Sequence, residues 1–155
     1  MTGELPWVVY LSQAECWDLL AASAVGRVGV VIDTAPEIYP VNHVVDDRTI
    51  VFRTDPGNKL SGLERTPSVC YQVDCVDVED NTGWSVLVKG RAVVVRAPDE
   101  LRRAALLPLR LWGLGEKATW VRIVPAEVTG RRIERDPPAA TPPGPSAAGG
   151  AGSDR

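Results

Sequence analysis

The stretch SVCYQVDCVDVEDNTGWSVLVKGRAVVVR, residues 68–96, decides the fold class of this chain. Ser68 to Val78 is a run rich in β-branched and aromatic residues, which are typical of strands. Asn81-Thr82-Gly83 supplies a turn, and Trp84 to Arg96 is a second apolar run. Two strands joined by a short turn pair as an antiparallel hairpin. The sequence therefore predicts a mainly β protein built around an antiparallel sheet.

The segment before this hairpin opens with a helix. Ser12 and Glu15, three residues apart, form a capping-box pattern, and apolar residues follow at helical spacing. This pattern predicts a helix from about residue 13 to residue 23, closed by Gly26.

Further strands are expected on both sides of the hairpin, over residues 27–33, 37–45 with an interruption at Pro40, 49–54, 119–124 and 127–133. Short helices are expected over 59–65 and from about 97 to 107, the latter with Asp99 as its N-cap. Residues 46–48 and 55–58 are expected to form turns, and 108–117 an irregular connection. About seven strands linked mainly by hairpins, with two or three short helices, favour an antiparallel barrel or sandwich over a doubly wound sheet.

Composition excludes several classes of partner. The net charge is −3 and the isoelectric point about 5.2, which argues against binding to nucleic acid or to anionic lipid. No apolar run approaches the roughly 20 residues that span a bilayer, and the first residues lack the features of a secretory signal. Cys16, Cys70 and Cys75 are expected to be free thiols in a reducing compartment, the last two buried within a strand. These features predict a cytoplasmic protein with no nucleic-acid or membrane partner.

The chain of 155 residues is long enough for one domain with its own core. Residues 136–155 hold Pro, Ala and Gly but no large apolar side chain, so they are expected to form a disordered tail after a folded domain over 1–135. The only histidine, His43, has no Cys or Asp cluster nearby, and no metal site is predicted. A backbone partner for His43 is the simplest expectation, and a place in a ligand pocket stays open.

Residues suited to phosphate binding are concentrated between Ile50 and Leu60. A strand ends in Arg53 and Thr54, a glycine-bearing loop follows, and a helix begins near Lys59. A guanidinium, a hydroxyl, an ammonium and the free N–H groups of a helix start are the donors that bind phosphate. The segment is not a P-loop, because it lacks the first glycine and the Ser or Thr after the lysine. On these residues alone, a solvated hairpin end with two surface cations stays open.

Several motifs, in order and spacing, resemble the pyridoxamine 5'-phosphate oxidase-like split β-barrel flavoproteins, especially small actinobacterial members related to nitroimidazole-resistance proteins. The resemblance covers about residues 8 to 135. The motifs that carry it are Leu11-Ser12 through Glu15-Cys16 with Leu19-Leu20, Val25-Gly26-Arg27-Val28, Pro40-Val41-Asn42-His43, Val51-Phe52-Arg53-Thr54 with Gly57 and Lys59-Leu60, Gly83-Trp84-Ser85-Val86-Leu87-Val88 with Gly90, and Val128-Thr129-Gly130-Arg131-Arg132-Ile133.

This resemblance implies an antiparallel split β-barrel that binds FMN at a homodimer interface. It implies that Arg53, Thr54 and Lys59, with Leu60 beside them, hold the phosphate. Val41 and Asn42 would lie against the isoalloxazine ring, and Phe52 near the ring or the ribityl chain. Trp84 and Ser85 would reach the cofactor of the partner subunit.

The function expected from this resemblance is an FMN-dependent oxidoreductase acting on an unknown small molecule. The flavin would carry the redox chemistry, and no residue is an obvious general acid or base. A reductase of the same fold that uses a 5-deazaflavin is one alternative, with Arg131 and Arg132 as extra cations for its anionic tail. A flavin-binding or sensory protein without turnover is another. Oxidation of vitamin B6 is not expected, because residues 119–135 lack the substrate signature of pyridoxamine phosphate oxidase.

Overall fold

The computed structural model describes residues 7–111 and 117–135, which form seven strands and three helices. Their order along the chain is β1 (Trp7–Tyr10), α1 (Gln13–Ala22), β2 (Val25–Ile32), β3 (Ala35–Asp46), β4 (Thr49–Thr54), α2 (Asn58–Arg65), β5 (Ser68–Asp77), β6 (Thr82–Val94), α3 (Pro98–Ala105) and β7 (Thr119–Glu134). The prediction of a mainly β, antiparallel protein with short helices is confirmed. The predictions for residues 136–155 lie outside the described residues.

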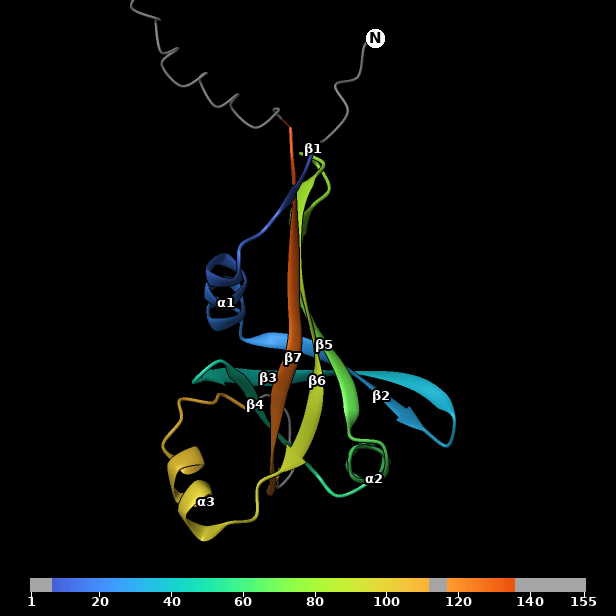
Figure 1. The fold of residues 1–155 in the computed structure, drawn as a ribbon, viewed down its shortest axis with the longest axis vertical. Coiled ribbons are helices and arrows are strands. Elements are labelled where there is room, and N and C mark those ends of the chain that lie inside the picture. The colour runs from blue at the N-terminus through green and yellow to red at the C-terminus, as the bar shows by residue number, and fades with distance from the viewer. Residues whose placement is uncertain (1–6, 112–116, 136–155) are drawn as a thin grey trace, which may run out of the picture.

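The sheet closes on itself to form a barrel. Its strand order is β1-β7-β4-β3-β2-β5-β6, every pair is antiparallel, and β6 also pairs with β7. Because β6 and β7 are thereby joined, the six strands from β7 to β6 form a closed ring, and β1 is added outside it. Helices α2 and α3 lie at one end of the barrel (Figure 1).

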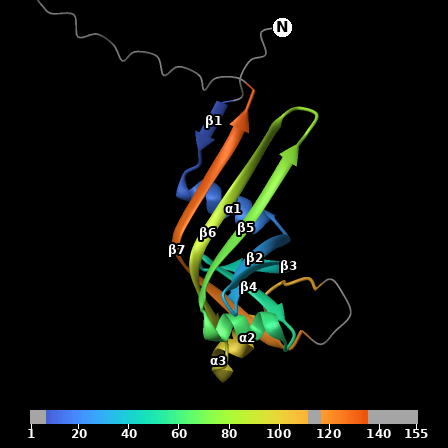
Figure 2. The ribbon, with the colours of Figure 1, turned by 90° about the vertical axis from the view of Figure 1, so that its right-hand side faces the viewer.

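Strands β5, β6 and β7 continue past the barrel as a projecting sheet. We call this part the arm and define it as β1 with residues 73–77, 82–86 and 130–134. Strand β2 pairs with β5 only as far as Gln72, so β6 is the sole strand partner of β5 within the arm. Figures 1 and 2 show the arm rising from the barrel, with α1 against one of its faces.

Helix α1 forms where the capping box predicts it. The Ser12 side chain accepts from the Glu15 backbone N–H, and the Glu15 carboxylate accepts from the Ser12 backbone N–H at 2.8 Å. The expectation that Gly26 ends the helix is wrong, because α1 ends at Ala22 with Ser23 as its C-cap. Gly26 lies inside β2, where a side chain would meet the Tyr71 ring: a Cβ atom would lie 2.3 Å from the hydroxyl oxygen. The glycine is needed for this close approach.

A Gly26→Ala variant is therefore expected to be less stable by about 1–3 kcal/mol, the usual effect of overpacking a core. Tyr71 is fully buried and cannot swing out to make room for the added methyl group. Urea unfolding followed by tryptophan fluorescence measures the change. A midpoint equal to that of the wild type would contradict the close packing of Gly26 on Tyr71.

Two prolines interrupt the sheet less than expected. Strand β3 runs through Pro40, which pairs with Arg27 of β2 but has no β4 residue on its other side, because β4 pairs only with His43 to Asp46. A proline is tolerated at such an edge. The two strands expected over 119–124 and 127–133 are one continuous strand, β7. Lys89 and Gly90 of β6 pair with Glu127 and Pro125, so β7 carries one extra residue, Ala126, and this bulge next to Pro125 accommodates the proline.

Three other expectations fail on local detail. Ala97 rather than Asp99 is the N-cap of α3, which has Pro98 in its first turn, and Asp99 forms an ion pair with Arg102. Cys70 and Cys75 are exposed rather than buried, whereas Cys16 is buried. Strand β1 was not expected, since four residues are too few to show a clear alternation.

His43 and Tyr71 form a buried polar pair inside the barrel. The Tyr71 hydroxyl lies 2.7 Å from His43 Nδ1, and His43 Nε2 lies 2.9 Å from the carbonyl oxygen of Leu20. Because a carbonyl can only accept, Nε2 carries the proton and Nδ1 accepts from Tyr71. Burial lowers the pKa of His43 and raises the pKa of Tyr71 above its ordinary value. Both groups are thus neutral, and the expected backbone partner of His43 is confirmed.

This pair predicts a loss of stability at mildly acidic pH. The unfolded chain takes up a proton on His43 near pH 6.5, whereas the folded chain resists it, so stability is complete above that pH and falls below it. The fall is at most about 1.4 kcal/mol per pH unit. A His43→Gln variant can still donate to Leu20 and accept from Tyr71, and its urea midpoint is expected to change less between about pH 7.5 and 5.5. Equal slopes for the two proteins would contradict this assignment.

Candidate functional site

A hollow lined by three cations lies where β3, β4 and the start of α2 meet. Its volume is about 270 Å³, and we call it the cationic hollow. The residues that line it are Tyr39, Pro40, Val41, Arg53, Thr54, Asp55, Pro56, Gly57, Asn58, Lys59 and Lys117. They come from β3, from the end of β4 with the loop into α2, and from the connection before β7.

Local structure explains why Arg53 and Lys59 share this hollow. Arg53 and Thr54 are the last residues of β4, and Lys59 is in the first turn of α2. Gly57, which joins the two elements, has a φ of 150°, a conformation that favours glycine. No side chain caps α2, so its first N–H groups remain available to a ligand at the helix start.

Arg53 and Lys59 of this hollow are arranged differently from most other cations of the described residues. Elsewhere the typical partner is a carboxylate, as for Arg27 with Asp74 and Arg122 with Asp46, both at 2.8 Å. Arg53 and Lys59 form no ion pair within the part of the chain that the structure describes. Among the same residues, nothing accepts a hydrogen bond from the buried Nε of Arg53. Arg53 and Lys59 therefore bring to the hollow positive charge that no carboxylate of the described residues neutralises by direct pairing.

Burial and a like charge both act on Lys59. Partial burial lowers the pKa of Lys59 below its ordinary value, the nearby Lys117 lowers it further, and Asp55 opposes the shift. A bound anion would reverse the balance, because it favours the charged ammonium. The chemistry of this donor set is that of an anion site, with one guanidinium, two ammonium groups and the amides of a helix start.

The structure brings together four of the nine residues that the sequence assigns to a cofactor site. Val41, Arg53, Thr54 and Lys59 line the cationic hollow. Asn42 and Phe52 are buried, and Leu60 is half-buried against the core, next to the residues that line the hollow. The assignment of these three residues to a cofactor stays a prediction.

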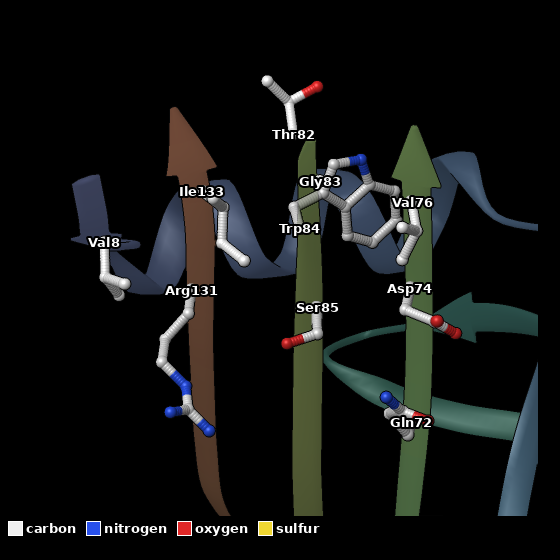
Figure 3. Close-up of a pocket in the computed structure, with 10 residues that line it drawn as sticks. All are labelled: Val8, Gln72, Asp74, Val76, Thr82, Gly83, Trp84, Ser85, Arg131 and Ile133. Carbon is white, nitrogen blue, oxygen red and sulfur yellow. The ribbon is translucent and has the colours of Figure 1, made fainter. Parts of the chain in front are cut away.

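Trp84 and Ser85 lie elsewhere, on the arm. They line a second hollow of about 230 Å³, the arm hollow, whose walls are Val8, Gln72, Asp74, Val76, Thr82, Gly83, Trp84, Ser85, Arg131 and Ile133 (Figure 3). Ser85 is in register with Asp74 and Arg131, whereas Trp84 is in register with Cys75 and Arg132. Since successive strand residues face opposite sides, the Ser85 side chain is on the face of the arm hollow, and Trp84 also lines a hollow with Cys75 and Arg132 on the other face.

The face that carries the arm hollow is apolar and exposed. Val8, Val76 and Ile133 come from three different strands and are 54%, 65% and 40% exposed. Figure 3 shows Val8 and Ile133 on neighbouring strands and Val76 on the far side of β6, with Arg131 on the same strand as Ile133. An exposed apolar surface of this kind is typical of an interaction site.

Sequence reasoning missed two residues of the cationic hollow, Tyr39 and Lys117. Tyr39 is on β3, two residues before the predicted Val41, so strand alternation places both on one face. Lys117 falls in the connection read as irregular. One signal was available: the chain has three lysines among seventeen basic residues, and two of the three line this hollow.

Within residues 7–111 and 117–135 there is no group of His, Cys, Asp or Glu side chains that could hold a metal ion. None of the helices in these ranges is both long enough and apolar enough to cross a bilayer.

A family model, related sequences and solved structures all match this chain over most of its length. Residues 12–132 match a family model described as pyridoxamine 5'-phosphate oxidase. The uncharacterized Mycobacterium tuberculosis protein Rv0080 is 38% identical over 134 residues, which are 83% of this chain and 88% of that protein. The structure of an FAD-binding protein from Mycobacterium smegmatis is 39% identical with a TM-score of 0.67, over 81% of this chain and 98% of that one. An FAD-binding protein from Mesorhizobium loti shares the fold, with a TM-score of 0.68 at 24% identity over 83% of this chain and 98% of that one.

Proposed function

The chain belongs to the pyridoxamine 5'-phosphate oxidase family, and we propose that it is a flavin-binding oxidoreductase that holds the flavin phosphate in the cationic hollow. The observation that carries this proposal is the pair of cations, Arg53 and Lys59, that face one hollow without a carboxylate partner among the described residues. A solvated hairpin end gives no reason for a buried guanidinium nitrogen without an acceptor.

The roles of the residues follow from their chemistry. Arg53 can donate two parallel hydrogen bonds to phosphate oxygens, Lys59 supplies a mobile point charge, and the Thr54 hydroxyl is a further donor. Lys117 also lines the hollow and carries a further positive charge. A bound flavin would accept and release hydride, and the protein would bind and orient it. The substrate is proposed only as a small molecule.

FMN is the cofactor that we propose first, since a terminal phosphate monoester suits a compact cluster of cations. FAD is the rival, because the similar protein from Mycobacterium smegmatis is named as FAD-binding. A 5-deazaflavin cofactor with an anionic tail is a third candidate, for which Arg131 in the arm hollow is a cation, whereas Arg132 pairs with Glu15 and Glu134. A flavin-binding protein without turnover would use the same hollow.

We further propose that a second copy of the chain covers the arm hollow and completes the site. The support is the exposed apolar face formed by Val8, Val76 and Ile133, which a lone protomer leaves in water. The cationic hollow is open and lined by cations, whereas a flavin ring requires a more apolar environment on its faces. A homodimer with the cofactor at its interface would supply that environment. Light scattering on the purified full chain measures the oligomeric state.

The decisive experiment compares FMN with riboflavin, which differ only in the phosphate, and adds FAD and a 5-deazaflavin cofactor as rival ligands. Equilibrium titrations with FMN, FAD, riboflavin and a 5-deazaflavin cofactor are monitored by flavin fluorescence. We expect FMN to bind at least about 100-fold more tightly than riboflavin, as two charge-assisted contacts imply. Equal binding of FMN and riboflavin would exclude the cationic hollow as the phosphate site. Steady-state assays with a panel of electron donors then separate an enzyme from a binding protein.

A further inference from the structure

The two central cations of the cationic hollow each lie over an aromatic ring. The Cζ atom of Arg53 is 5.0 Å from the centroid of the Trp120 ring, and the Nζ atom of Lys59 is 5.0 Å from the centroid of the Tyr39 ring. Both distances are within the range of a cation–π interaction. The two rings belong to different strands, β7 and β3, on either side of β4 in the sheet.

An aromatic ring differs from a carboxylate as a partner for a cation. A carboxylate neutralises the charge and takes up the N–H donors, as Asp74 does for Arg27 at 2.8 Å. A ring face attracts the cation through its quadrupole but accepts few hydrogen bonds, so the charge and most donors stay available. The choice of ring over carboxylate therefore suits a site whose cations must bind an external anion.

The surrounding structure fixes both rings. Trp120 is the direct cross-strand neighbour of Arg53 in the β4–β7 pair, so the two side chains lie on the same face of the sheet. The Tyr39 hydroxyl donates to the Glu37 carboxylate. This hydrogen bond keeps the Glu37 carboxylate, which is on the same strand as Tyr39, at the hydroxyl end of the Tyr39 ring.

We propose that Tyr39 and Trp120 are positioning residues of the anion site, which hold Lys59 and Arg53 by their ring faces so that both cations stay uncompensated and face the hollow. This inference rests on the proposed function of the hollow. The two aromatic residues are not part of the sequence motifs of the phosphate segment. Their effect on binding should depend on the phosphate group of the ligand alone.

The test at Trp120 compares Trp120→Phe, which keeps a ring, with Trp120→Leu, which removes it. The measured quantity is the ratio of the riboflavin and FMN dissociation constants, because a general packing defect weakens both ligands and leaves the ratio unchanged. We expect Trp120→Leu to lower the ratio roughly 5-fold and Trp120→Phe to lower it less, as the strength of an isolated cation–π contact implies. A wild-type ratio in Trp120→Leu, or an equal loss in both variants, would overturn the role of Trp120.

The test at Tyr39 needs a background without the Glu37 carboxylate, since loss of the hydroxyl would release Glu37 toward Lys59. In a Glu37→Gln chain, Tyr39→Phe retains the ring and Tyr39→Leu removes it. The same ratio is measured, and we expect a loss of roughly 5-fold only for the leucine variant. Equal ratios in the two variants would exclude a role for the Tyr39 ring.

A second measurement is independent of flavin. The side-chain amine of Lys59 is titrated by NMR in the full chain without ligand, and its signal is assigned with Lys89→Arg and Lys117→Arg variants, because the chain has three lysines. In the Glu37→Gln background, we expect a lower pKa for Lys59 in the Tyr39→Leu variant than in the Tyr39→Phe variant, since the ring stabilises the ammonium. Equal pKa values would overturn the inference even if FMN binds. A protein that binds no flavin but shows this pKa difference would instead refute the proposed function alone.

Discussion

Replacement of both Arg53 and Lys59 by alanine is expected to weaken FMN binding by about 3–6 kcal/mol, since each residue supplies a charge-assisted contact of about 1.5–3 kcal/mol. Riboflavin, which lacks the phosphate, is expected to bind the double variant almost as well as the wild type. Both cations are partly exposed and line the hollow rather than the core, so the fold should tolerate their loss. Fluorescence titration with each ligand measures the effect.

Lys89→Ala is the matched control for this experiment. Lys89 is an exposed lysine that pairs with Glu127 at 3.4 Å on strands β6 and β7, and it does not line the cationic hollow. Its loss is expected to leave both affinities unchanged. If the double variant bound FMN as tightly as the wild type, the phosphate would lie elsewhere, and Arg131 in the arm hollow would be the next cation to test.

A pair of glutamates on the arm, Val76→Glu with Ile133→Glu, is expected to convert the proposed dimer into monomers. Burial of two carboxylates without partners opposes association by several kcal/mol, which corresponds to a rise in the dimer dissociation constant of roughly 100-fold or more. Because the proposed flavin site requires both subunits, the FMN affinity should fall when the dimer dissociates. Light scattering and FMN titration on the same samples test the link between the two losses.

Leu106→Glu serves as the control for the arm. Leu106 is 85% exposed at the C-terminal end of α3, near the end of the molecule opposite the arm (Figure 1). The Leu106→Glu variant adds one carboxylate, where the arm variant adds two, at an exposed apolar position, and neither the oligomeric state nor the FMN affinity should change. A monomeric wild type, or a double variant that stays dimeric, would contradict the arm as the interface. A monomeric variant with full FMN affinity would show that one chain suffices for binding.

Contacts close in the sequence were predictable, and contacts set by register were not. Arg53, Thr54 and Lys59 lie within seven residues of each other, so the local pattern of strand, loop and helix was enough to place them together. Trp120 becomes the neighbour of Arg53 only through the pairing of β4 with β7, more than sixty residues away in the chain. No local pattern specifies that register.

The same limit explains the errors in the fold. A glycine shortly after a helix is typical of a helix C-cap, which is why Gly26 was expected to end α1. Its actual role depends on Tyr71 of β5, which comes close to Gly26 because β2 pairs with β5. Pro125 resembles a strand break, but a partner strand with a register shift carries β7 through it. The cysteines of β5 were expected inside because the strand is apolar overall, yet both lie on its exposed positions.

Strand β7 connects the two hollows with a single extended segment. It begins one residue before Trp120, which holds Arg53, and it ends one residue after Ile133 on the arm. At about 3.3 Å per residue, its sixteen residues span about 50 Å. Loss of one paired residue between Glu127 and Gly130 would shift the rest of the strand by one position, and Arg131 and Ile133 would exchange faces with Arg132. Length changes should therefore be poorly tolerated in this strand, and a tag or insertion is better placed in a loop.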